Sequence, residues 1–182
     1  MGLTTIQMTP EYLQDRRHVK SLLCAYLTAQ NALLDAIIGY EAVCENEFGA
    51  KTGPGDGMPH SRNTHRDLSD WYVRKDERAE AVSSKAAYCE QVRSILLSVI
   101  EHAGLTAEEL AVVKARYIDL HPVRMATAAG AYRTTEWTLT PYGQIGAAMN
   151  MTYSAVTHAH DRAIEKLSKR LACVCEKMQQ AS

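Results

Sequence analysis

Apolar and weakly polar residues recur at alternating spacings of four and three through the first quarter of the chain. The stripe consists of Val19, Leu23, Tyr26, Gln30, Leu33, Ile37, Tyr40 and Cys44. This spacing places them on one face of a helix and is typical of a coiled coil or a long helical hairpin. We expect one helix from Thr9 to about Phe48, with Thr9 as N-cap and Pro10 at the first helical position. Such a helix needs a partner to cover its stripe.

A second apolar stripe follows a segment that has little to bury. It consists of Val82, Ala86, Cys89, Val92, Leu96, Val99 and Ala103. We expect a helix from residues 67–69 to Ala103, ended by Gly104, and a flexible loop rich in Gly and Pro over residues 49–66. Two long helices joined by one loop fold back as an antiparallel, coiled-coil-like pair. The pair either closes on itself or dimerises with a second copy, and the stripes do not distinguish these arrangements.

A change of pattern after Gly104 predicts two domains, a helical hairpin over residues 1–104 and a second domain over residues 105–182. Thr106 and Glu109 form a T-x-x-E capping box that starts the first helix of the second domain. Residues 121–139 show no clear period, so we expect an irregular insertion, with a helical turn over 123–129 as an alternative. The chain is therefore expected to be all-α.

The segment Thr140–Leu171 has the pattern of a helix-turn-helix. Thr140 is expected to cap a short helix that Pro141 opens, and Asn150 tolerates the left-handed conformation that ends one. Thr152 can then cap a longer helix. Two helices separated by about three residues match helix-turn-helix geometry, in which the second helix enters the major groove of DNA. The apolar residues expected to meet between the two helices are Ile145, Met149, Met151 and Val156.

Polar residues at the start of the longer helix are the candidates for contact with DNA. Hydroxyl, imidazole and phenol groups can donate to or accept from base edges, and cations and capping hydroxyls suit phosphates. The expected base-reading residues are Tyr153, Ser154, Thr157 and His158. The expected phosphate contacts are Thr152, Arg162, Lys166 and Lys169.

The segment YGQIGAAMNMTYSAVTHAHDRAIEKL resembles the DNA-reading domain of sigma factors. The matched positions are Ile145-Gly146, Thr152, Val156, Arg162-Ala163 and Lys166-Leu167, and Arg116-Tyr117 matches the end of that domain's leading helix. With long helices before it, the chain is similar to phage and prophage regulators of the ArpU and RinA kind. The resemblance implies control of late genes by a DNA-binding protein that contacts RNA polymerase. Two departures are the insertion at 121–139 and Gly146, where the family usually has Ala.

Other kinds of site have little support in the sequence. His158 and His160 are two residues apart, so on a helix they point away from each other and cannot share a metal ion. Cys173 and Cys175 have the same spacing, and no nucleotide loop or catalytic triad pattern stands out. We therefore expect no enzyme, no cofactor and no metal. No run of 18 apolar residues occurs and the start does not resemble a secretory signal, so a cytoplasmic protein without a membrane span is expected.

The charge distribution allows DNA binding of modest strength. The net charge is −1, which argues against holding a polyanion by bulk charge alone. Residues 1–104 carry 11 basic and 14 acidic side chains, whereas residues 105–182 carry 9 and 7. Double-stranded DNA is the expected partner, with homo-oligomerisation through the N-terminal helices. Two alternatives stay open, a packaging factor of the small-terminase type and a helical scaffold or adaptor that does not bind DNA.

Overall fold

The protein is mostly helical with one small two-stranded sheet. The computed structural model describes residues 11, 14–45, 68–127 and 130–180, so Thr9, Pro10 and the expected loop at 49–66 lie outside the described residues. The elements are α2 (Arg16–Leu23), α3 (Ala25–Glu45), α4 (Leu68–Glu101), α5 (Ala107–Tyr117), β1 (His121–Ala126), β2 (Tyr132–Thr138), α6 (Tyr142–Met149) and α7 (Tyr153–Gln180).

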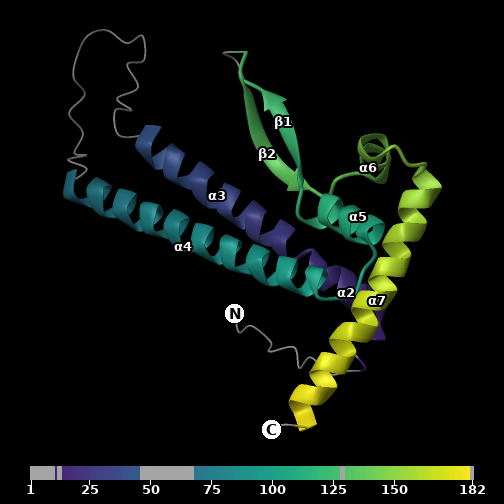
Figure 1. Cartoon of the computed structure of the whole chain (residues 1–182). Coiled ribbons are helices and arrows are strands. Elements are labelled where there is room, and N and C mark those ends of the chain that lie inside the picture. The colour runs from purple at the N-terminus through teal and green to yellow at the C-terminus, as the bar shows by residue number, and fades with distance from the viewer. Residues whose placement is uncertain (1–10, 12–13, 46–67, 128–129, 181–182) are drawn as a thin grey trace, which may run out of the picture.

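The long helices α3 and α4 lie side by side and run in opposite directions (Figure 1). The indole Nε1 of Trp71, near the start of α4, donates to the carbonyl oxygen of Val43, near the end of α3, at 3.2 Å. Within the described residues, the single first helix expected from the sequence is broken twice. Asp15 is extended and caps α2, and at Cys24 the backbone N–H bonds to the carbonyls of both Lys20 and Ser21. The apolar side of α2 and α3 is covered best near Cys24, where Val19, Leu23, Tyr26 and Ala29 are buried.

The segment Arg16–Glu45 is long and apolar enough to span a membrane by length and composition, with a mean hydropathy of 1.4. Only 17% of the most apolar 18-residue stretch of this segment is buried inside the protein. A helix in the core of a water-soluble protein passes the same test. Polar side chains of this segment make specific contacts with other elements, because Asn31 and Glu41 bind β2 and Arg16 binds α7. These contacts join the segment to β2 and to α7.

The segment expected to be irregular is a β-hairpin, so that expectation and its helical alternative are wrong. Strands β1 and β2 pair antiparallel, with His121 opposite Thr138 and Ala126 opposite Tyr132. The register shifts between Val123 and Arg124, which marks a bulge. Gly130, with φ of +77°, is in the tight turn between the strands, a conformation that suits glycine.

The hairpin is held on α3 by polar contacts with β2. The side-chain amide of Asn31 donates to the carbonyl of Trp137 at 3.0 Å and accepts from its N–H at 2.8 Å. Further along both elements, Arg133 pairs with Glu41. An isolated two-stranded hairpin is marginally stable in water, so this docking explains why the segment folds as a sheet. Figure 1 shows the resulting order of α4, α3 and hairpin.

One hydrophobic core extends across the expected domain boundary at Gly104. It takes residues from the helices on both sides of that boundary, because α2 packs on α7 and α4 packs on α5. The largest fully buried contributors are Val19, Cys89, Ile100, Val113, Ile164 and Leu167. The two segments that the sequence suggests as separate domains therefore share their interior, and α7 crosses the end of the hairpin formed by α3 and α4 (Figure 1).

Candidate nucleic-acid interface

The turn between α6 and α7 is short and depends on two residues with special backbone requirements. Asn150 ends α6 in the left-handed conformation, with φ of 57° and ψ of 38°, as expected from the sequence. The N–H of Met151 then donates to the carbonyl of Gly146 at 2.8 Å. A Cβ atom at Gly146 would lie 2.7 Å from the carbonyl oxygen of Met151, so glycine permits this close approach.

The angle between α6 and α7 is fixed by a small apolar cluster. Ile145 and Val156 are buried there against Val112 of α5, and Met149 and Met151 pack on the cluster. Ile145, Met149, Met151 and Val156 therefore belong to one cluster, as the sequence predicted. The cluster packs on one side of the amino-terminal end of α7, around Val156, and leaves Tyr153, Ser154 and His158 exposed.

The start of α7 is capped as predicted, whereas the start of α6 is not. The hydroxyl of Thr152 accepts from the N–H of Ala155 at 3.2 Å. Thr140 was expected to cap α6, but its hydroxyl donates to the carbonyl of Asp119, and Pro141 occupies the N-cap position without a side-chain hydrogen bond. Thr140 therefore ties the end of the hairpin to the end of α5 instead of capping a helix.

The four expected base-reading residues differ in how free their polar groups are. Ser154 and His158 are exposed, and the described residues provide no partner for the Ser154 hydroxyl or the His158 ring. Tyr153 is 63% exposed and meets the ring of Tyr142 edge-on at 6.0 Å. Thr157 is half-buried, and its hydroxyl donates to the carbonyl of Ser154 at 2.9 Å. The first turns of α7 thus present Tyr153, Ser154 and His158 to solvent.

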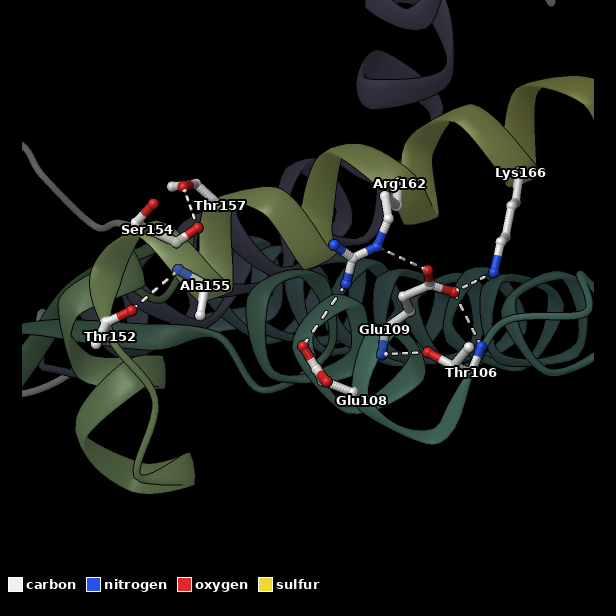
Figure 2. A network of polar contacts seen from close by, with 9 residues as sticks. All are labelled: Thr106, Glu108, Glu109, Thr152, Ser154, Ala155, Thr157, Arg162 and Lys166. Carbon is white, nitrogen blue, oxygen red and sulfur yellow. Dashed lines mark hydrogen bonds and ion pairs between the residues drawn. The ribbon is translucent and has the colours of Figure 1, made fainter.

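Arg162 and Lys166 reach from α7 to the start of α5, where both meet the carboxylate of Glu109 (Figure 2). Lys166 Nζ lies 2.7 Å from Glu109 Oε2, and Arg162 Nε lies 3.3 Å from Glu109 Oε1. Arg162 also pairs with Glu108 at 3.8 Å. These two expected phosphate contacts are therefore already paired inside the protein.

Glu109 is the buried centre of this network, with a side chain that is only 2% exposed. It is also the N3 residue of the predicted capping box, which is confirmed. Its Oε2 accepts from the N–H of Thr106 at 2.9 Å, and its N–H donates to the Thr106 hydroxyl. Burial by itself raises the pKa of Glu109, but the hydrogen bonds from Lys166 and Thr106 outweigh it and lower the pKa to about 2. The carboxylate is therefore charged at neutral pH.

A second set of ion pairs joins α7 to α2, and no local pattern in the sequence indicates it. Arg16 Nη2 lies 3.0 Å from Glu165 Oε2, and Lys20 Nζ lies 3.8 Å from Asp161 Oδ1. Lys169, an expected phosphate contact, pairs with Glu165 at 2.8 Å. Arg16 and Lys20 are four residues apart and so share a helix face. Only the packing of α2 on α7 brings them beside residues about 145 positions away.

Behind the exposed end of α7, His160 is buried in an aromatic cluster. Its Nε2 lies 3.0 Å from the hydroxyl of Tyr117, and its Nδ1 lies 3.3 Å from Asp161 Oδ1. A carboxylate only accepts, so Nδ1 carries the proton and Nε2 accepts from Tyr117. Burial lowers the pKa of His160 and raises the pKa of Tyr117, which keeps both groups neutral. The guanidinium of Arg116 covers the ring of Tyr142 at 4.1 Å and completes the cluster.

Comparison of the chain with protein-family models, curated proteins and solved structures finds no match. Within the described residues, no three His, Cys, Asp or Glu side chains gather in an arrangement that could hold a metal ion. The functional argument therefore depends on the geometry of α6, α7 and the residues around them.

Proposed function

We propose that the protein is a sequence-specific regulator of transcription that binds double-stranded DNA through the amino-terminal end of α7. In this proposal α6 and α7 form a helix-turn-helix, with α5 as its leading helix, in the manner of the sigma-like ArpU and RinA regulators. Tyr153, Ser154 and His158 contact base edges in the major groove. The Thr157 hydroxyl, which donates to the Ser154 carbonyl, can still accept a hydrogen bond from a base. Thr152, at the start of α7, contacts a phosphate.

The observation that carries the proposal is the free amino-terminal end of a long helix, set by a tight turn against a short helix. The left-handed Asn150, the close approach at Gly146 and the Thr152 cap produce this arrangement. Ser154 and His158 then offer unpaired polar groups that suit base edges.

Selection of bound sites from random duplex DNA by the full-length protein tests the proposal. The selected site is then compared with a scrambled duplex by fluorescence anisotropy. We expect Ser154→Ala and His158→Ala to reduce discrimination between the two duplexes by about 1–3 kcal/mol each, while low-salt binding to random DNA persists. Ser84→Ala, which changes an exposed serine on α4, is the matched control and leaves discrimination unchanged. Absence of any bound species at low salt would exclude DNA binding, including the packaging alternative.

The proposal includes two further partners, a second copy of the chain through the N-terminal helices and RNA polymerase. Light scattering measures the oligomeric state. A small oligomer supports a regulator, whereas a ring of eight or more subunits, about the size typical of packaging rings, supports the small-terminase alternative. A protein that binds no DNA and yet assembles is best explained as a scaffold.

A further inference from the structure

The cations around α7 fall into two sets that differ in the burial of the carboxylates they pair with. Arg162 and Lys166 pair with Glu109, whose side chain is 2% exposed. Arg16, Lys20 and Lys169 pair with Asp161 and Glu165, whose side chains are 59% and 43% exposed. The cations of both sets are accessible to solvent, so the two sets differ in the burial of the carboxylate and not in that of the cation.

Burial of the carboxylate decides which cations can be given up to a phosphate. Removing the partner of a buried charge is strongly destabilising, because the charge is left without water or a counter-ion. An exposed carboxylate is rehydrated when its partner leaves, and exposed ion pairs contribute little to stability. Arg162 and Lys166 are therefore held by Glu109, whereas Arg16, Lys20 and Lys169 can exchange their carboxylates for phosphate oxygens.

The position of the exposed carboxylates Asp161 and Glu165 along α7 also fits contact of their partner cations with the DNA backbone. A helix rises about 1.5 Å per residue, so Asp161 and Glu165 lie about 5 Å and about 10 Å beyond His158 along the axis. The major groove is about 8.5 Å deep, so a helix end inserted to His158 brings these positions level with the rim, where the phosphates lie. A surface hollow between the start of α2 and α7 is lined by Arg16, Glu165 and Lys169.

We propose that Arg16 and Lys20 of α2, together with Lys169 of α7, form the surface that contacts DNA phosphates. The inference rests on the proposed function, and it makes the N-terminal helix part of the DNA-binding surface. It also gives Arg162 and Lys166 the different task of holding α7 on α5. Three cations face two carboxylates here, a local excess of one positive charge, so binding is expected to be of modest strength and sensitive to salt.

The salt dependence of DNA binding by the full-length protein tests the inference. Each phosphate contact contributes about 0.9 to the slope of log K against log salt, so Arg16→Ala/Lys20→Ala lowers that slope by about 1.8 for every duplex sequence. Arg74→Ala/Lys85→Ala removes the same charge types from exposed positions on α4 and leaves the slope unchanged. Urea unfolding of each variant verifies that it is folded under the conditions of the binding assay.

Substitution of the carboxylates supplies a test of opposite sign. Asp161→Asn/Glu165→Gln frees the same cations and removes two negative charges, so affinity for every duplex rises. Unchanged affinity of this variant would count against the inference. If the wild type binds DNA and Arg16→Ala/Lys20→Ala keeps its slope, the inference is wrong and the proposed function stands. If the wild type binds no duplex, the proposed function itself fails.

Discussion

Replacement of Gly146 by alanine tests whether the turn between α6 and α7 depends on the close backbone approach. The added Cβ would lie 2.7 Å from the carbonyl oxygen of Met151 and 3.6 Å from the side chain of Val156. Cβ atoms essentially never approach an oxygen so closely, so the turn must move. Its displacement strains the hydrogen bond from the Met151 N–H to the Gly146 carbonyl and the packing of Val156.

The expected magnitude follows from three contributions. Overpacking of a fitted contact costs about 1–3 kcal/mol, and a weakened backbone hydrogen bond costs about 1 kcal/mol. Alanine is favoured over glycine within a helix by about 1 kcal/mol, which offsets part of this loss. Gly146→Ala should therefore lower the free energy of unfolding by about 1–3 kcal/mol.

Gly143 provides a matched control in the same helix. A Cβ at Gly143 meets nothing within 4 Å, so Gly143→Ala gains the helix preference alone and should stabilise the protein by about 1 kcal/mol. Urea unfolding followed by circular dichroism measures both variants. If Gly146→Ala proves as stable as Gly143→Ala, the close approach does not constrain the turn, and the account of the α6–α7 geometry is refuted.

Three further predictions concern buried or half-buried polar groups. Glu109→Gln should lower the free energy of unfolding at neutral pH by about 3 kcal/mol, since the native pKa of about 2 lies well below the ordinary 4.5. That contribution is complete above about pH 4.5 and is lost as pH falls through about 2, so the variant and wild type should converge in acid; a constant difference would exclude the carboxylate as its source. Asn31→Ala should cost about 2 kcal/mol by leaving the N–H and carbonyl of Trp137 unpaired, and should speed hydrogen exchange of that amide. His160→Phe should weaken the fall in stability below about pH 6.5, because the native histidine is buried with a lowered pKa and resists protonation; a pH profile like that of the wild type would contradict this.

Local rules explain why the ends of the C-terminal helices could be predicted from the sequence. The capping box of Thr106 and Glu109, the left-handed Asn150 and the Thr152 cap depend on residues at most a few positions apart. The same holds for the apolar stripes that form α3 and α4. At Thr140 a local rule failed, because its hydroxyl donates to the carbonyl of Asp119, which lies 21 residues away.

The β-hairpin marks the limit of that local prediction. Residues 121–139 show no clear period, and two short strands gain little stability alone. The amide of Asn31 and the carboxylate of Glu41, on a helix about 100 residues earlier, supply the missing partners. No pattern within residues 121–139 carries that information.

The sequence by itself determined the long helices, the turn after α6 and the polar side chains at the start of α7, because neighbouring residues decide each of these. Only the tertiary structure decided how the charges around α7 are used. It placed the buried Glu109 beside Arg162 and Lys166, and it brought Arg16 and Lys20 to the exposed carboxylates of α7. The physical reason is that the strength and availability of an ion pair depend on burial, which is a property of the packed chain rather than of any segment.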